Sequence, residues 1–287
     1  MKKVLVTGAT GQLGASLQLN GYITIKTDLF QPDTKENITI LDITNEDQVK
    51  ILLDNEKPDI IVHLAAMTNV DGCELNPDQA QLINVQGTVN LLNHFDGKFI
   101  LISSDYVFDG KDGPYREEDE VHPINVYGQT KLDAEEKVRE CSNDWIILRT
   151  NVVWNIGGNF KASFADWVVE ELKNNRKIQI VDDQWNNPTW TVDLSRVIGQ
   201  LLHFDASGVY HYGSANILNR YKFASLIANV YELNDSLIEP ITTKELNQPA
   251  KRPLKCGLIT DKIKRDFNIL PSKTHMDIKE AKMRTIQ

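Results

Sequence analysis

The segment VTGATGQLG, residues 6–14, decides the fold of this chain. It continues an apolar, β-rich run and sets Gly8, Gly11 and Gly14 three positions apart, directly before a short amphipathic stretch. Glycines allow a sharp turn between a strand and a helix. They also let a pyrophosphate approach the amides at the helix N-terminus, where the helix dipole favours negative charge. We therefore expect a dinucleotide-binding βαβ unit, with a merely structural glycine turn as the alternative.

Short apolar runs alternate with helical patterns up to about residue 150. Such runs are typical of parallel strands covered by helices on both faces, because no polar alternation is then needed. The clearest amphipathic segment is 44–59, where Thr44 and Asp47 predict a capping-box start and Pro58 follows the expected end. The alternation predicts an α/β fold, a Rossmann-type doubly wound parallel sheet with right-handed crossovers. The expected strands are KKVLVTG (2–8), YITIKTD (22–28), PDIIVHLAA (58–66), KFILISS (98–104) and WIILRT (145–150).

The second half of the chain continues the alternation, and from about residue 219 the pattern loosens. We expect residues 1–150 to form the NAD(P)-binding core. Residues 151–287 are expected to interleave the remaining core elements with a smaller C-terminal substrate-binding lobe. The periodicity predicts helices around 164–175 and 191–204 and strands at 177–181 and 208–213.

Composition excludes several classes of protein. The 287 residues carry a net charge of -9 without a block of Lys or Arg, which argues against a general nucleic-acid surface. No segment approaches the roughly 20 apolar residues of a membrane span, and no cleavage site follows the N-terminus, so we expect a cytoplasmic protein. Cys73, Cys141 and Cys256 are scattered and odd in number, which predicts reduced thiols. No His or Cys motif indicates a metal site.

The ends of the predicted strands supply further candidates for cofactor contacts. Asp28 lies twenty residues beyond Gly8, where a carboxylate can bond a ribose 2′-hydroxyl and repel a 2′-phosphate. NADH is therefore slightly favoured over NADPH, although Lys26 could offset the repulsion and a solvated loop aspartate is the alternative. The strand-end residues Asp42, Ile43, Ala65, Ala66 and Thr68 are expected beside the cofactor, with ordinary packing as the alternative for each.

The stretch YGQTK, residues 127–131, places Tyr127 and Lys131 on one face of a predicted helix. The ammonium can then reach the cofactor ribose and help to stabilise a tyrosinate, so that Tyr127 acts as a general acid or base. Ser103 and Ser104 follow a buried strand, where a hydroxyl can bond the reacting oxygen. The full set of expected cofactor contacts is Gly8, Thr10, Gly11, Gln12, Leu13, Gly14, Asp28, Asp42, Ile43, Ala65, Ala66, Thr68, Tyr127 and Lys131.

These residues resemble the extended short-chain dehydrogenase/reductase superfamily, and within it the dTDP-4-dehydrorhamnose reductase family. The resemblance covers nearly the whole chain, and its most specific segments are SSDYVFDG (103–110) and DQWNNPT (183–189). It implies reduction by NADH or NADPH of the 4-keto group of a dTDP-bound 6-deoxyhexose, for cell-surface polysaccharide. By the same matching, the catalytic residues are Ser104, Tyr127 and Lys131, and Val70, Ser104, Asp105, Tyr106 and Tyr127 contact the nucleotide-sugar substrate. A homodimer is considered as the assembly, without a sequence signal for it.

One departure from the family pattern concerns the sugar pocket. Where the family commonly reads LRTSW, this chain has Asn151 and Val152 after Thr150, with Trp154 two positions later, so an aromatic wall is expected to be missing or shifted. For the nucleotide diphosphate, Lys161 and Arg252 are the candidate cations, with an exposed surface charge as the alternative.

Two buried-looking polar residues favour a structural role. Asn84 is expected to be a buried polar helix residue near the site, and His63, inside an apolar run, a core histidine with satisfied hydrogen bonds.

Two other functions stay open beside the reductase. The first is a nucleotide-sugar epimerase or dehydratase of the same superfamily, which retains its NAD and regenerates it in each cycle. The second is a non-catalytic regulatory subunit of the methionine adenosyltransferase type, which resembles the same family and uses the fold to bind a partner. The DQWNNPT segment favours the reductase over the epimerase, and the complete Ser-Tyr-Lys set favours it over the regulatory subunit.

Overall fold

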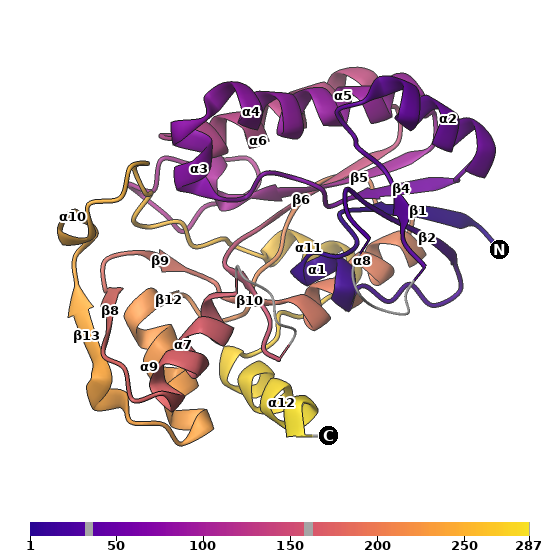
Figure 1. Ribbon diagram of the computed structural model, residues 1–287. Helices are drawn as coiled ribbons and strands as arrows, with labels where there is room; N and C mark the ends of the chain where they lie inside the picture. Colours follow the sequence, from indigo (N-terminus) through magenta and orange to yellow (C-terminus); the bar gives the residue numbers. More distant parts are fainter. Residues whose placement is uncertain (32–36, 158–162, 287) are drawn as a thin grey trace.

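The core of the molecule is a seven-stranded, all-parallel sheet with the strand order β11-β6-β5-β4-β1-β2-β3. The computed structural model describes residues 1–31, 37–157 and 163–286 (Figure 1). The order reverses between β1 and β4, which confirms the predicted doubly wound topology. The strands are β1 Lys3–Thr7, β2 Ile23–Asp28, β3 Thr39–Ile40, β4 Ile60–His63, β5 Lys98–Ser104, β6 Trp145–Thr150 and β11 Gly208–His211.

Helices cover both faces of this sheet. One layer contains α2 (Glu46–Glu56), α5 (Gly87–Asn93) and α6 (Val126–Cys141), and the other contains α1 (Gln12–Ser16), α8 (Thr191–His203) and α11 (Asp261–Phe267) (Figure 1). Within β1, Val4 and Val6 pack into the cluster with α1 and α8, whereas Leu5 packs into the cluster with α2 and α6. Successive side chains of one strand therefore enter two different cores, which explains why the strands are continuously apolar.

The start of α2 differs from the expected capping box. Its N-cap is Asn45, whose side-chain oxygen accepts a hydrogen bond from the backbone N–H of Gln48 at 3.1 Å. The Thr44 hydroxyl instead donates to Oδ1 of Asp42 at 2.7 Å. Asparagine caps as well as threonine, and here it lies one residue closer to the helix, so the predicted start was wrong by one position. The helix ends at Glu56, before Pro58, as predicted.

A smaller lobe packs beside the carboxyl edge of the sheet. Its own core surrounds the buried aromatic residues Trp154, Trp190 and Phe223. Because α8 and β11 return to the main sheet from within this half of the chain, the lobe elements and core elements alternate along the sequence. The remaining elements are α3 Val70–Leu75, α4 Pro77–Gln81, a π-helical turn Leu82–Gln86, 3₁₀ turns Asp105–Val107 and Asp235–Leu237, β7 Val153–Trp154, α7 Phe164–Lys173, β8 Ile178–Val181, β9 Trp185–Asn186, β10 Thr189–Trp190, β12 Leu218–Asn219, α9 Arg220–Tyr231, β13 Ile238–Ile241, α10 Thr243–Leu246 and α12 Thr274–Ile286.

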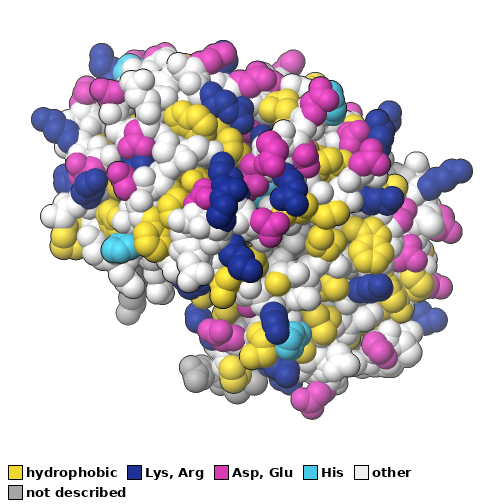
Figure 2. All heavy atoms as spheres, turned by 180° about the vertical axis from the view of Figure 1, so that it is seen from behind, with side chains coloured by type: hydrophobic (Ala, Val, Ile, Leu, Met, Phe, Trp, Pro, Cys, Tyr) yellow, Lys and Arg dark blue, Asp and Glu magenta, His cyan; other side chains and the backbone are white. Residues whose placement is uncertain are grey.

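The surface carries charges of both signs. Figure 2 shows Lys and Arg side chains interspersed with Asp and Glu over the face opposite to that of Figure 1. No helix among the described residues combines the length and the apolar character that crossing a membrane requires.

Candidate functional site

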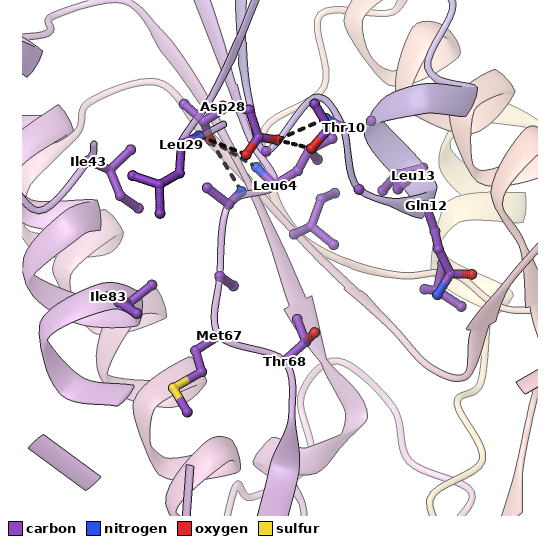
Figure 3. A pocket seen from close by; sticks show the side chains of 18 of the residues that line it. Thr10, Gln12, Leu13, Asp28, Leu29, Ile43, Leu64, Met67, Thr68 and Ile83 are labelled. Atoms are coloured by element: carbon purple, nitrogen blue, oxygen red, sulfur yellow. Dashed lines mark hydrogen bonds between the residues drawn. The ribbon is translucent and has the colours of Figure 1, made fainter. Parts of the chain in front are cut away.

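A cavity of about 750 Å³ opens at the carboxyl ends of β1, β2, β4, β5 and β6 (Figure 3). This is the edge where parallel α/β sheets bind ligands, and the volume is in the range of small-molecule sites. The cavity brings the expected cofactor contacts together with all three of the expected catalytic side chains. The predicted residues that line it are Gly8, Thr10, Gly11, Gln12, Leu13, Gly14, Asp28, Asp42, Ile43, Ala65, Ala66, Thr68, Ser104, Tyr127 and Lys131.

The glycine loop is shaped by close backbone contacts. Gly8 has a φ of +68°, and a Cβ atom there would lie 2.7 Å from the backbone nitrogen of Ala65. A Cβ at Gly14 would lie 2.4 Å from the carbonyl oxygen of Gly8. Both positions therefore require glycine, the first for its left-handed backbone and the second so that α1 can pack onto the loop.

Asp28 anchors the same loop from the end of β2. Its Oδ2 accepts hydrogen bonds from the Thr10 backbone N–H at 2.9 Å and from the Thr10 hydroxyl at 2.8 Å, and its Oδ1 accepts from the Leu29 N–H (Figure 3). The half-buried carboxylate lines the cavity as expected. Sequence reasoning did not foresee its bonds to Thr10, because they join two loops through their tertiary arrangement.

The lining leaves polar atoms for a ligand to satisfy. Three oxygen atoms of lining residues are buried without a hydrogen-bond partner among the described residues: Oε1 of Gln12, Oγ1 of Thr150 and Oδ1 of Asn151. Buried polar atoms are normally paired, so three unpaired oxygens in the lining of one cavity indicate a polar ligand. Together with the glycine loop and the Lys131 ammonium, they fit a nicotinamide dinucleotide: the loop would hold the diphosphate, and Lys131 a ribose.

The candidate catalytic side chains come from two neighbouring elements. Ser104 ends β5, donates to Oδ1 of Asp105 at 3.1 Å and accepts from the Tyr106 N–H at 3.2 Å. Tyr127 lies in the first turn of α6, which Asn125 caps by accepting from the Gly128 N–H at 2.8 Å. The phenol is hydrogen-bonded to Ser104. Lys131 follows one turn later and is only 4% exposed.

Burial dominates the protonation of this pair. It raises the pKa of the Tyr127 phenol; the hydrogen bond with Ser104 lowers it in part, and the charge of Asp105 raises it further. Burial also lowers the pKa of Lys131 to about 8, against the opposing charge of Glu135. Burial therefore sets the direction of the phenol pKa, and this direction is opposite to the lowering that was expected from Lys131. The phenol is therefore protonated at physiological pH, which is the form that a general acid starts from.

Three of the expected substrate residues lie outside the lining of this cavity. Val70 begins α3, and Asp105 and Tyr106 are buried in the 3₁₀ turn that follows Ser104. The Tyr106 ring meets the Tyr127 ring edge-on at 5.7 Å, and burial raises the pKa of Asp105 to about 7. Asp105 and Tyr106 thus lie directly behind the reactive side chains, because the chain turns inward immediately after β5.

The candidate cations also differ from expectation. Arg252 forms an ion pair with Asp71 at 2.9 Å, and its side chain is only 8% exposed, so it is neither a solvated surface charge nor unpaired. Lys161 lies outside the described residues. Arg220, which sequence reasoning missed, opens α9 and is hydrogen-bonded to Tyr106, and its charge also acts on Asp105. No local sequence signal marks Arg220, because tertiary packing alone brings it there.

Asn84 and His63 both have structural roles, as expected. Asn84 accepts from the Met67 N–H at 2.7 Å and donates to the Met67 carbonyl and the Thr130 hydroxyl, so it shapes the loop that carries Ala65 to Thr68. His63 contacts the hydroxyls of Thr7 at 2.7 Å and Thr88 at 3.1 Å. Burial, followed by the charge of Lys131, lowers its pKa to about 3, so it is neutral at physiological pH.

Val152 and Trp154, the residues where the sequence departs from the family pattern, lie in different parts of the structure. Val152 lines the cavity and adopts a φ of +44°, a left-handed conformation that β-branched residues rarely take. Trp154 is fully buried in the lobe core, with its ring 6.1 Å from Trp190 and 5.6 Å from Phe223. The aromatic side chain is therefore shifted out of the cavity.

Known proteins resemble this chain over its whole length. A dTDP-4-dehydrorhamnose reductase of Aggregatibacter actinomycetemcomitans is 33% identical, covering 95% of each chain. Methionine adenosyltransferase 2 subunit beta of Xenopus laevis is 30% identical, covering 89% of this chain and 81% of the relative. The solved dTDP-4-dehydrorhamnose reductase of Bacillus anthracis, in complex with NADP, superposes with a TM-score of 0.87 at 29% identity, covering 99% of each chain.

The family model described as RmlD substrate binding domain matches residues 1–285. This match spans the glycine loop, the Ser-Tyr-Lys residues and the lobe together. The chain therefore belongs to the RmlD substrate binding domain family.

Proposed function

We propose that this protein reduces the 4-keto group of a dTDP-4-keto-6-deoxyhexose with NADH or NADPH, as in the conversion of dTDP-4-dehydrorhamnose to dTDP-rhamnose. One observation carries the proposal: a single cavity brings the glycine loop together with Ser104, Tyr127 and Lys131. The relatives named dTDP-4-dehydrorhamnose reductase support the substrate class.

Each side chain has one task in this reaction. A bound nicotinamide would supply the hydride that reduces the carbonyl carbon. The Ser104 hydroxyl donates a hydrogen bond to the carbonyl oxygen, and the Tyr127 phenol transfers its proton to that oxygen as charge develops. Lys131 binds the ribose and places a positive charge near the phenolate that remains. Hydride and proton together convert the ketone into an alcohol.

The lobe supplies the other side of the substrate site in this proposal. Residues 1–150 hold the cofactor, and the lobe after β6 receives the nucleotide of the sugar, near Arg220 and Arg252. The charges of both guanidinium groups lower the pKa of the Tyr106 phenol, so both groups lie near this ring. Substrate entry would therefore place the diphosphate beside two cations and its sugar toward Tyr127.

An assay of NADH and NADPH oxidation with dTDP-4-keto-6-deoxy sugars tests the function. Stoichiometric oxidation of cofactor with formation of the 4-hydroxy sugar supports the reductase. Retention of NAD through desalting, with interconversion of sugars and no net oxidation, indicates an epimerase or dehydratase instead. A stoichiometric complex with a methionine adenosyltransferase and no turnover of any keto-sugar indicates a regulatory subunit.

We further propose that Asp28 gives the enzyme its preference for NADH. Asp28→Asn should raise the ratio of kcat/KM for NADPH to that for NADH by about tenfold, because the substitution removes a negative charge facing the 2′-phosphate. Steady-state kinetics with both cofactors measure the ratio.

Thr10→Val is the matched control for Asp28→Asn. It deletes the 2.8 Å hydroxyl bond to Asp28 but leaves the carboxylate charge in place. Loosening of the loop should weaken the binding of both cofactors alike. The ratio of kcat/KM for NADPH to that for NADH should therefore stay near its original value. An unchanged ratio in Asp28→Asn would show that Asp28 does not face the ribose.

A further inference from the structure

Glu135 lies under the reactive side chains and bonds to two strands. It is fully buried on α6, one turn after Lys131 and two turns after Tyr127. Its Oε1 accepts from the Ser103 hydroxyl at 2.6 Å and from Arg149 Nε at 2.9 Å, and its Oε2 accepts from Arg149 Nη2 at 2.7 Å. The carboxylate thus ties α6 to the ends of β5 and β6.

These bonds keep Glu135 charged and fixed. Arg139 adds a fourth hydrogen bond to Oε2 at 2.8 Å from the surface side, and the pKa of the Glu135 carboxyl stays below its usual range because these donors outweigh burial. With both oxygens engaged, the side chain does not swing to form a direct ion pair with Lys131. The ammonium therefore stays available for the cofactor ribose, while a fixed negative charge lies one helical turn away.

The other titratable groups around Tyr127 and Lys131 do not supply this charge. His63, from β4, is neutral at working pH, and Cys73, from α3, keeps its proton because burial raises the pKa of its thiol to about 11. Tyr127 is neutral below its raised pKa. Asp105, in the turn after β5, acts on Tyr127 and is bonded to Ser104, and burial raises its pKa to about 7.

Two cations are paired with the carboxylate. Arg149, on β6, and Arg139, on the outer turn of α6, both contact Glu135 itself. Among the charged groups, Glu135 is the one that opposes the effect of burial on Lys131.

We propose that Glu135 is a positioning residue of the reductase, whose fixed carboxylate keeps the buried Lys131 ammonium protonated and free to hold the cofactor ribose. The role of Glu135 in catalysis rests on the proposed function. Its direct consequence, the pH dependence of NADH affinity, can be measured without any sugar substrate. The protonated form of Lys131 binds NADH. The affinity for NADH is therefore highest below the Lys131 pKa of about 8 and falls as the pH rises through that value.

The test is the dissociation constant for NADH, measured by fluorescence between pH 6 and 10 on the full chain. In Glu135→Gln, the loss of NADH affinity should begin about one pH unit lower than in the unsubstituted protein, because a nearby opposite charge favours the protonated ammonium and its removal lowers the Lys131 pKa. Lys131→Met should bind more weakly and show no such loss, which assigns the titration to Lys131.

Two further variants separate charge from structure. Arg139→Gln removes a positively charged neighbour of Glu135 and leaves the carboxylate in place. The pH at which this variant loses NADH affinity should therefore not decrease. Glu135→Gln combined with Arg149→Gln replaces the ion pair by a neutral hydrogen-bonded pair, so it remains informative if the single variant, with its unpaired buried arginine, does not fold.

The inference is overturned if folded Glu135→Gln, or the double variant, loses NADH affinity over the same pH range as the unsubstituted protein. An equal decrease, in Arg139→Gln, of the pH at which NADH affinity is lost would also overturn the inference. Because NADH binding requires no sugar, these outcomes stand apart from the proposed function, which fails instead if the unsubstituted protein reduces no keto-sugar.

Discussion

Tyr127→Phe should lower kcat for keto-sugar reduction by about 10²- to 10⁴-fold, the usual contribution of a general acid, and leave NADH affinity nearly unchanged. The phenylalanine ring preserves the edge-on contact with Tyr106 at 5.7 Å, so the first turn of α6 keeps its packing. What the variant lacks is the transferable proton, which burial holds on the phenol by raising its pKa. Single-turnover reduction, followed at the absorbance of the reduced nicotinamide, measures the chemical step directly.

Tyr106→Phe is the matched control. Its ring is also buried next to Ser104, and burial raises the pKa of its phenol to about 12, but it does not line the cavity. We expect its effect to fall mainly on KM for the sugar, through the lost contact with Arg220. Near-normal turnover in Tyr127→Phe, or an equal loss of kcat in Tyr106→Phe, would reject Tyr127 as the proton donor.

The sheet and the cofactor side of the site were predictable because their signals are local. Continuous apolar runs such as KFILISS identify strands buried on both faces, and the glycine spacing in residues 6–14 identifies the first turn. Parallel strands place their carboxyl ends at one edge, so Asp28, Ala65 and Ser104 converge without any knowledge of side-chain contacts. The one-residue error at the start of α2 reflects two adjacent residues that are both good caps.

The substrate side was less predictable, because its contacts join segments far apart in the chain. Arg220 reaches Tyr106, and Arg252 reaches Asp71, through loops whose paths no periodicity specifies. The same holds for the protonation of Tyr127. Spacing alone predicted that Lys131 would lower the phenol pKa, whereas burial, a tertiary property, decides its direction.

Trp154 shows the same limitation, and its role yields the second large prediction. Trp154→Ala should lower the free energy of unfolding by about 3–5 kcal/mol, the usual cost of deleting a buried aromatic side chain. The indole is fully buried between Trp190 and Phe223 and packs in the lobe core, away from the cavity. Urea unfolding followed by circular dichroism measures the loss.

Val152→Gly is the partner experiment, since Val152 lines the cavity two residues before Trp154. Glycine tolerates the φ of +44° without strain, so the relief of strain should offset the lost side chain and keep stability within about 1 kcal/mol. Removing a wall of the pocket should instead change KM for keto-sugars of different size. If Trp154→Ala changed sugar selection without loss of stability, the tryptophan would have to reach the sugar, and the assignment of Val152 to the pocket wall would be wrong.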